Sequence, residues 1–258
     1  LISRNHIYRT TRGIWLDWMN QGSRVTCNLL HDNGPSEDLF VEVDHGPFMV
    51  DNNLFLSSTS LLDVSQGGAY VHNFFAGRIV QHPELRRETP YHKPHSTELA
   101  GLAKIKGGDN RFYNNIFAGA TGLAPYDKAT HPMYVSGNVY LNGAKPSKHD
   151  QQALVLEDYD PRIELTEHAA GVRLQMNIDQ TWTEKVLRNL VTTDLLNKAK
   201  VPNLPYKQPN TTPYNINTDY FGRKRNPNNP TPGPFEPQND LPQTANQYWR
   251  VWPIPVPR

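Results

Sequence analysis

The chain has 258 residues, of which 37% are hydrophobic, enough for one large domain or two ordinary ones with a buried core. Its 26 Lys and Arg residues balance 25 Asp and Glu residues, and the formal net charge of +1 excludes the strongly basic surface of proteins that bind nucleic acids or anionic membranes. The single Cys27 excludes an internal disulfide. No apolar run approaches the roughly 20 residues that cross a bilayer, so we expect neither a nucleic-acid nor a membrane partner.

The chain begins at Leu1, and the phrase SRNHIY that follows reads as the middle of a repeat. This start predicts that upstream sequence is missing, which leaves room there for any signal peptide and for a domain or part of the active site. We therefore expect an upstream segment of the same protein to be a partner of this chain. A secreted or periplasmic location is favoured over a cytoplasmic one, and a homo-oligomer is left open.

A short phrase of asparagine followed by alternating apolar residues recurs through the first 145 residues. Its copies are spaced by 23, 25, 20, 42 and 23 residues and start at Asn5, Asn28, Asn53, Asn73, Asn115 and Asn138. This period predicts an all-β fold, a right-handed parallel β-helix whose turn asparagines stack in a ladder. The interval of 42 corresponds either to two coils or to one coil with a long insertion.

The segment from about 81 to 101 is polar, rich in Pro and His, and lacks strand alternation, which predicts a loop inserted into one coil. We expect residues 1–145 to form the coils with the active-site face. Residues 146–258 are expected to pack on this solenoid as a strand over 169–176, one short helix over 183–198 and an extended Pro-rich tail. Aromatic residues are expected to anchor the tail: Tyr206, Tyr214, Tyr220, Phe221, Phe235, Tyr248, Trp249 and Trp252.

Alignment of the coils on the repeated asparagine brings charged residues to one strand position. Counting back ten or eleven residues from successive asparagines reaches Asp17, Glu42, Asp63 and Lys104. Strand residues alternate between faces, and the neighbours of these four are all apolar, so the charged column is predicted to face outward. The neighbours expected to face the interior are Leu16, Trp18, Val41, Val43, Leu62, Val64, Ala103 and Ile105.

Asp17 and Glu42 on neighbouring rungs would lie about 4.8 Å apart at the backbone. Retaining glycosidases hold their two carboxyl groups roughly 5 to 5.5 Å apart. Like charges this close do not ionise independently, so one carboxyl can serve as general acid and the other as nucleophile. The alternatives are a solvated acidic ladder, or a calcium site formed by these two residues with Asp44 and Asp63.

Two positions before each charged residue, the same outward face is predicted to carry Trp15, Phe40, Leu61 and Leu102. Aromatic rings beside carboxylates suit the apolar face of a sugar, which makes Trp15 and Phe40 candidate substrate-binding residues. The alternative is that the C-terminal tail or the upstream segment packs on these side chains.

Three phrases, GIWLDWMNQGSRVTCNLL, DLFVEVDHGPFMVDNNLFLSS and LLDVSQGGAYVHNFF, resemble the β-helix glycosidases of glycoside hydrolase family 120, known for β-xylosidase activity. TPYHKPHSTELAGL and NTDYFGRKRNPNNPTPGPFE are similar to this wider group, and the match covers only the C-terminal portion of a typical member. The resemblance implies a retaining mechanism in which Asp17 of GIWLDWM is the nucleophile and Glu42 of DLFVEVDHG the acid/base. It implies a β-xylosidase that acts on plant-type oligosaccharides, as in xylan degradation.

Further residues are candidate ligands of sugar hydroxyls. Asp63 is expected on the rung after Glu42, where its alternative role is to raise the pKa of Glu42. The others near the cleft are His45, Gln66, His92, His95 and Lys104. Each has a structural alternative: His45 would order a turn, His92 and His95 would hold the inserted loop, and Lys104 would pair with Asp63. The histidine spacing matches no zinc motif, so no metal or other cofactor is expected, with a structural calcium ion left open.

Two other functions stay open beside the glycosidase. A β-helix polysaccharide lyase would use Lys104 as its base together with calcium held by the acidic column. A non-catalytic carbohydrate-binding β-helix would hold sugar through Trp15 and Phe40 without cleaving it. All three have an oligosaccharide partner.

Overall fold

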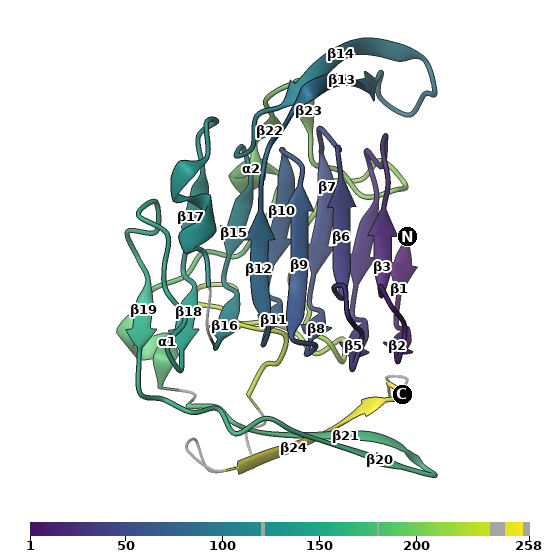
Figure 1. The fold of residues 1–258 in the computed structure, drawn as a ribbon. Helices are drawn as coiled ribbons and strands as arrows, with labels where there is room; N and C mark the ends of the chain where they lie inside the picture. Colours follow the sequence, from purple (N-terminus) through teal and green to yellow (C-terminus); the bar gives the residue numbers. More distant parts are fainter. Residues whose placement is uncertain (120–121, 180, 238–245, 255–258) are drawn as a thin grey trace.

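The structure, a computed structural model, describes residues 1–119, 122–179, 181–237 and 246–254. Its body is the right-handed parallel β-helix that the repeat predicts, with three parallel sheets that run along the solenoid (Figure 1). Sheet A contains, in spatial order, β1 (Ile2–Ser3), β4 (Arg24–Thr26), β7 (Phe48–Asp51), β10 (Gly68–Val71), β15 (Arg111–Tyr113) and β17 (Tyr134–Ser136).

Sheet B and sheet C complete each coil. Sheet B contains β2 (His6–Tyr8), β5 (Leu29–His31), β8 (Leu54–Phe55), β11 (Phe74–Phe75), β16 (Ile116–Ala118), β18 (Val139–Leu141) and β19 (Leu154–Leu156). Sheet C contains β3 (Ile14–Leu16), β6 (Leu39–Glu42), β9 (Thr59–Val64) and β12 (Arg78–Gln81).

The repeated asparagines form the predicted ladder at the corner between sheets A and B. Each Oδ1 accepts hydrogen bonds from the backbone N–H and the Nδ2 of the asparagine one coil earlier, at 2.9 to 3.1 Å. Each Nδ2 from Asn28 onward also donates to a backbone carbonyl one coil earlier, as Asn73 does to Val50 at 2.8 Å. The ladder fixes the phase of the coils from Asn5 to Asn138.

The interval of 42 residues is one coil with an insertion, because β10 pairs directly with β15 and β11 with β16. The insertion is a β-hairpin, β13 (Glu84–His92) and β14 (Leu99–Ile105), where the sequence predicted an irregular loop. The hairpin crosses the end of sheet C and rises above the solenoid (Figure 1).

Apolar side chains that point inward from the three sheets fill the solenoid. Stacked rings run along this interior from coil to coil, with Phe55 on Phe75 at 5.1 Å and Phe75 on Phe117 at 5.1 Å. Tyr126, from the 3-10 helix η1 (Ala124–Lys128), also enters this core.

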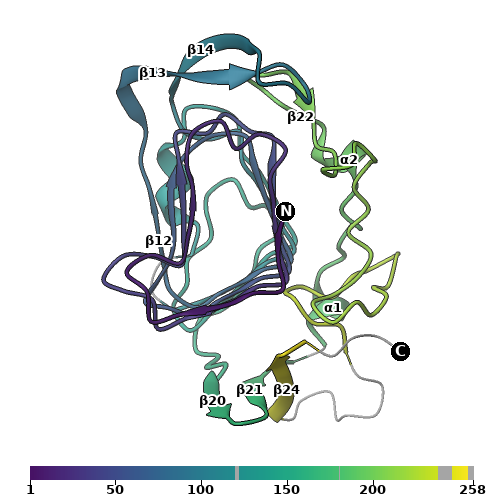
Figure 2. The same cartoon turned by 90° about the vertical axis from the view of Figure 1, so that its right-hand side faces the viewer.

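The C-terminal region covers two of the three outer faces. The outer face of sheet A packs against Val191, Leu196, Tyr206, Tyr214 and Ile216, from a segment with α2 (Thr193–Leu196), β22 (Lys198–Ala199) and β23 (Leu204–Pro205). The outer face of sheet B packs against the antiparallel sheet β20 (Glu164–His168), β21 (Gly171–Asn177) and β24 (Asn246–Trp252). In a view along the solenoid axis, these layers lie on two sides of the coil and the hairpin lies on a third. No further layer covers the side with β12 (Figure 2).

The strand predicted over 169–176 is present as β21, but the helix predicted over 183–198 is wrong. The segment forms two four-residue helices, α1 (Trp182–Lys185) and α2, because its apolar residues serve different faces. Trp182 packs in the cluster on sheet B, whereas Val191 and Leu196 pack on sheet A. Of the expected tail anchors, Tyr248 is exposed, while Phe221 and Trp252 are partly buried and the other five are buried. No helix among the described residues has the length and hydropathy to span a membrane.

Candidate active site

Sheet C presents Asp17 and Glu42 at equivalent positions on neighbouring coils. Trp15 pairs with Phe40 and Leu16 with Val41, so the register places Asp17, directly after β3, beside Glu42 at the end of β6. Leu16 and Val41 point into the core, as predicted. Asp17 is exposed and Glu42 is half-buried.

The predicted charged column ends at Glu42, because the next strand is shifted by one residue. β9 pairs Val41 with Asp63 and Glu42 with Val64, so Asp63 points inward, and its predicted outward position is wrong. The same shift turns Leu62 and Val64 outward and Leu61 into the core.

Asp63 is fully buried inside the solenoid. Its Oδ2 accepts hydrogen bonds from the Tyr126 hydroxyl at 2.6 Å and from Asn110 Nδ2 at 2.8 Å, and its Oδ1 accepts one from the Ser65 hydroxyl. Burial raises the pKa of the Asp63 carboxyl, and these hydrogen bonds act in the opposite direction. A side chain so placed orders the core and does not reach a ligand on the outer face.

Three other expected positions also differ. Trp18 is 41% exposed rather than internal, since β3 ends at Leu16. Val43 has a φ of 48° and packs in the outer cluster with Phe40, Val64 and Ile105. Lys104 lies with Ala103 and Ile105 in β14 and is exposed, so it is neither on a rung of the column nor paired with Asp63.

The two candidate catalytic carboxylates have different neighbours. Asp17 Oδ1 accepts a hydrogen bond from the backbone N–H of Trp18 at 2.8 Å. Glu42 Oε2 accepts one from the Trp15 indole Nε1 at 3.1 Å, and Glu42 Oε1 pairs with Arg87 Nη2 at 3.3 Å. Glu42 is therefore held by two donors, one from its own sheet and one from the hairpin.

Trp15 is 52% exposed and offers a ring on the open face. Phe40 lies beside it with ring centroids 5.7 Å apart, but Phe40 is only 8% exposed and supports Trp15 from the next coil. The Arg12 guanidinium lies 4.8 Å from the Trp15 centroid and 4.5 Å from that of Phe40. Leu102, on the hairpin, is also exposed.

His45 and Gln66 are buried away from the open face. His45 Nε2 contacts the Thr89 hydroxyl at 2.9 Å and His45 Nδ1 contacts Gln66 Nε2 at 2.8 Å. Gln66 Oε1 accepts from the backbone N–H of Lys106 at 3.0 Å. Burial lowers the pKa of His45 to about 4, so the ring is neutral near pH 7. The pair ties the base of the hairpin to the coil that carries Glu42.

His92 and His95 lie at the far end of the hairpin and line a pocket of about 540 Å³. Met19 and Gln21, from the loop after Asp17, form one side of this pocket, and Leu204 and Lys207 form another. The backbone N–H of His92 donates to Gln21 Oε1 at 2.6 Å. The loop that follows Asp17 therefore contributes to the pocket, but neither Asp17 nor Glu42 lines it.

The four carboxylates of the alternative calcium site do not share a face. Asp44 and Asp63 are buried, whereas Asp17 is exposed on the outer surface. Burial raises the pKa of Asp44 to about 7, and its Oδ2 has no hydrogen-bond partner among the described residues. One cation cannot take all four as ligands in this arrangement.

Two residues of the site are not predicted by the sequence pattern. Arg87 pairs with Glu42 and lies 5.1 Å from the Trp18 ring, and Arg12 covers Trp15. Arg87 belongs to the inserted hairpin, whose fold the asparagine repeat does not specify. The spacing of the repeat therefore cannot predict that Arg87 lies opposite Glu42. Arg12 lies in the turn before β3, three residues from Trp15, where the alternation pattern has not yet begun.

No family model and no curated protein matches the chain. A solved structure described as XylC in complex with xylose matches with a TM-score of 0.85 and 35% sequence identity, over 97% of this chain and 43% of that chain. This chain therefore spans less than half of the length of XylC. The resemblance inferred from the sequence is confirmed by this match: the chain is a right-handed parallel β-helix similar to XylC and to the β-helix glycosidases of glycoside hydrolase family 120.

Proposed function

We propose that the chain carries the catalytic face of a retaining glycoside hydrolase that acts on β-linked xylose. The observation that supports this most is the pair Asp17 and Glu42, side by side on adjacent coils of sheet C, whose outer face the C-terminal region does not cover. The 35% identity to XylC, a protein solved with xylose, supports the choice of sugar.

Asp17 is the proposed nucleophile. The Trp18 amide holds Oδ1 and thereby orients the carboxylate, so that Oδ2 attacks the anomeric carbon. The bond from that carbon to the leaving oxygen breaks as the bond to Asp17 forms, and the product is a covalent xylosyl enzyme. The exposed Trp15 ring supplies an apolar surface for the sugar beside the reacting carbon.

Glu42 is the proposed acid/base. Its contacts with Trp15 and Arg87 hold the side chain in place, and in the second step its carboxylate removes a proton from the water that attacks the xylosyl enzyme. The first step uses the protonated carboxyl: Oε1 leaves Arg87, contacts the leaving-group oxygen and gives it the proton, and Glu42 is then ionised for the second step. Because Arg87 is on the hairpin, this insertion becomes part of the site for the leaving group.

Covalent trapping tests the proposal. We expect the full-length protein to hydrolyse aryl β-xylosides and to react with a 2-fluoroxylosyl fluoride, with the mass increment on the peptide that contains Asp17. Asp17→Asn should show no adduct. Xylose binding without hydrolysis of any aryl glycoside would instead identify a carbohydrate-binding β-helix, and an unsaturated product would identify a lyase.

A further inference from the structure

We propose that His45 is a positioning residue for Glu42: it fixes the inserted hairpin, and the hairpin in turn holds Arg87 opposite the Glu42 carboxylate. The kinetic consequence rests on the proposed function of Glu42 as acid/base. The placement of the hairpin is a separate matter, which can be measured without any turnover.

Two contacts close a small circuit between the coil and the hairpin. Glu42 Oε1 lies 3.3 Å from Arg87 Nη2. Three residues after Glu42, His45 Nε2 lies 2.9 Å from the hydroxyl and 3.0 Å from the carbonyl oxygen of Thr89. Arg87 and Thr89 are two positions apart on β13, and both side chains contact this coil. The anchor at Thr89 is therefore close to the residue that contacts Glu42.

Arg87 lies in a part of β13 that is not paired residue by residue with β14. The two strands pair at Glu84 and again at Thr89, with a shift in register between these positions. The four residues 85–88 thus oppose a single residue of β14, which makes a bulge. The position of a bulge depends on the pairs that flank it, and the flanking pair nearer to Arg87 is the one at Thr89.

Gln66 orients the His45 ring and determines its tautomer. Gln66 Oε1 accepts from the backbone N–H of Lys106 at 3.0 Å, and its Nε2 donates to the backbone carbonyl of Lys104 at 3.2 Å. With the amide oriented in this way, Gln66 Nε2 donates its second hydrogen to His45 Nδ1, 2.8 Å away. The proton of the neutral imidazole is then on Nε2, which donates it to Thr89. His45 thus joins β13, through Thr89, to the end of β14, through Gln66.

The contact between His45 and Thr89 is shielded from water. Both residues are 1% exposed, and the Tyr91 ring packs edge-on against the imidazole at a centroid distance of 5.7 Å. Burial lowers the pKa of His45, so the ring keeps its single proton near neutral pH. Loss of this donor would leave Thr89 with one partner fewer in a buried site, which favours movement of the hairpin toward solvent.

Movement of the hairpin would affect one step of the proposed reaction more than the others. Arg87 is the hairpin's donor to Glu42, and its guanidinium also lies 5.1 Å from the Trp18 ring, next to Asp17 in the chain. If Arg87 shifts, Glu42 is less well placed to protonate the leaving oxygen. Substrates with poor leaving groups need this proton, whereas activated phenols depart with little of it.

A double-mutant cycle in the full-length protein tests the kinetic consequence. His45→Leu removes the donor and should slow the hydrolysis of alkyl β-xylosides at least about tenfold more than that of nitrophenyl β-xylosides. In an Arg87→Ala background, the same substitution should add less than about twofold, because the contact that it maintains is already absent. His45→Gln, whose amide N–H can reach Thr89, should restore much of the lost rate.

Hydrogen exchange tests the placement of the hairpin without a substrate. The backbone amides of β13 should exchange faster in His45→Leu than in the parent, while those of β5 and β8 should not change. Thr89→Val removes only the hydroxyl, so it should show the same change to a smaller extent, and it replaces His45→Leu if that variant does not fold. If the parent has no xylosidase activity, the proposed function fails, and the exchange of β13 still decides whether His45 places the hairpin.

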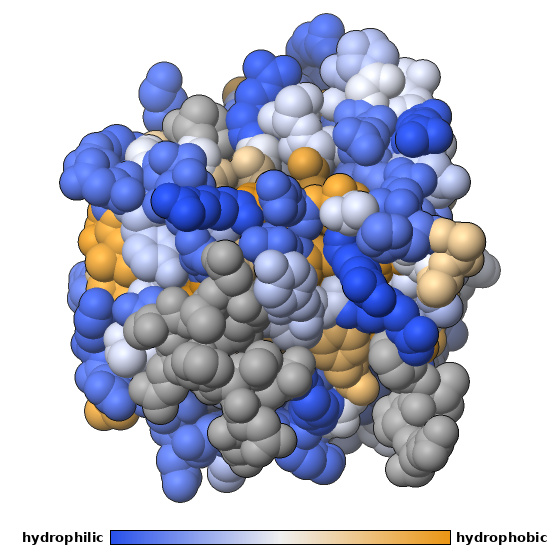
Figure 3. Space-filling view, turned by 90° about the horizontal axis from the view of Figure 1, so that it is seen from below, coloured by the Kyte–Doolittle hydropathy of each residue, from blue (hydrophilic) through white to orange (hydrophobic). Residues whose placement is uncertain are grey.

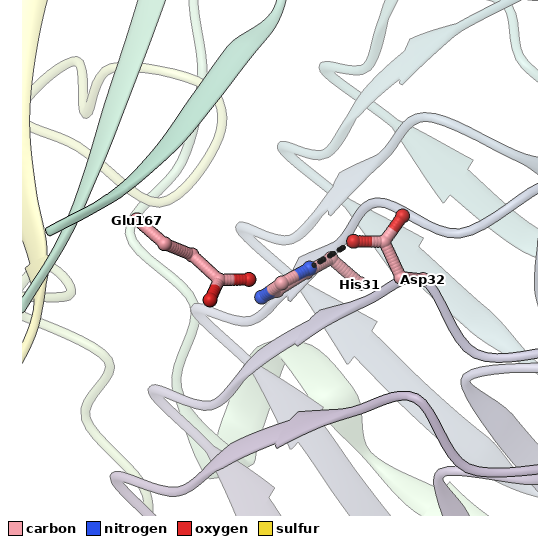
Figure 4. Close-up of side chains that lie close together, drawn as sticks. All are labelled: His31, Asp32 and Glu167. Atoms are coloured by element: carbon pink, nitrogen blue, oxygen red, sulfur yellow. Dashed lines mark hydrogen bonds and ion pairs between the residues drawn. The ribbon is translucent and has the colours of Figure 1, made fainter.

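His31 provides a matched control, because it is also a buried histidine on a coil. Its Nδ1 lies 2.8 Å from Asp32 Oδ2, and Glu167 of β20 extends toward its ring (Figure 4). Sheet B, which carries His31, lies at the bottom of the molecule in Figure 1, opposite the hairpin. Seen from below, the surface is largely hydrophilic with patches of hydrophobic residues (Figure 3). His31→Gln should leave both the leaving-group dependence and the exchange of β13 unchanged.

Two results would overturn the proposal. One is unchanged exchange of β13 in both His45→Leu and Thr89→Val. The other is a loss of rate that is equal for the two classes of xyloside, or that adds in full to the loss from Arg87→Ala, because His45 would then support the fold without acting through Arg87.

Discussion

Asp17 and Glu42 occupy equivalent strand positions but have different surroundings, and this difference suits the roles proposed for them. Asp17 is exposed beside a single backbone donor, whereas Glu42 is held between an indole and a guanidinium. A nucleophile needs an accessible oxygen, and an acid/base needs a carboxyl group held in position for proton transfer.

These roles predict contrasting kinetics. Asp17→Ala should abolish turnover on all substrates, because no covalent intermediate forms. Glu42→Ala should slow substrates with poor leaving groups by roughly 10²- to 10⁴-fold, and aryl glycosides with activated phenols far less. Azide should partly restore the activity of Glu42→Ala by attacking the glycosyl enzyme, which gives a glycosyl azide of retained configuration. In Asp17→Ala it should attack the substrate directly and give the azide of inverted configuration. Equal losses on both substrate types, without azide products, would mean that another pair is catalytic.

Asp44 predicts a pH dependence of stability. Burial raises its pKa from the ordinary 3.8 to about 7, so between these values the folded chain holds a proton that the unfolded chain releases. The free energy of unfolding therefore decreases as the pH rises through this window. Asp44→Asn keeps an acceptor for the Gly46 amide and removes the titration.

The stability of Asp44→Asn relative to the parent should increase between pH 4 and pH 8, by up to about 4 kcal/mol. Urea unfolding at a series of pH values measures this difference. Parallel curves for the two proteins would show that Asp44 does not titrate in the window.

At the scale of the elements, the asparagine spacing and the alternation of apolar residues predicted the coils, the ladder and the adjacency of Asp17 and Glu42. They failed at Asp63, because the shortened coil from Asn53 to Asn73 moves β9 by one residue, and a shift of one residue exchanges the two faces of a strand. Tyr126, which donates a hydrogen bond to the buried Asp63, belongs to the 3-10 helix η1 much later in the chain. The residues around Asp63 do not predict this contact. The hairpin was missed as well, since its strands pair only with each other.

The contribution of each ladder asparagine to stability depends on whether it lies inside the ladder or at its end. Asn73 is buried, and its Oδ1 accepts from both the N–H and the Nδ2 of Asn53. Asn73→Ala leaves the buried N–H of Asn53 unpaired, removes one of the hydrogen bonds of the Asn53 Nδ2, and should cost roughly 2 to 5 kcal/mol of unfolding free energy. Asn5→Ala, at the exposed end of the ladder, should cost less than about 1 kcal/mol. Equal urea midpoints for the two variants would contradict this gradient.

At the scale of the whole molecule, the C-terminal region covers the outer faces of sheets A and B and leaves that of sheet C open. If sugar binds at the proposed site, its effect on backbone dynamics should be confined to that side. Hydrogen exchange with and without xylose should show protection in β3, β6 and the hairpin, and no change in β20 and β21. Protection of the C-terminal sheet alone would place the sugar elsewhere.

The ladder also explains how this solenoid accommodates coils of unequal circumference. Because each asparagine restarts the register, the chain between two of them can shorten or lengthen without disturbing the neighbouring coils: 20 residues complete the coil from Asn53, and 42 complete the next one with the hairpin included. A change in the length of one coil is thus accommodated within that coil. A fold of this kind can add a wall beside an existing surface by lengthening one coil, and the hairpin that brings Arg87 opposite the proposed acid/base Glu42 is such a wall.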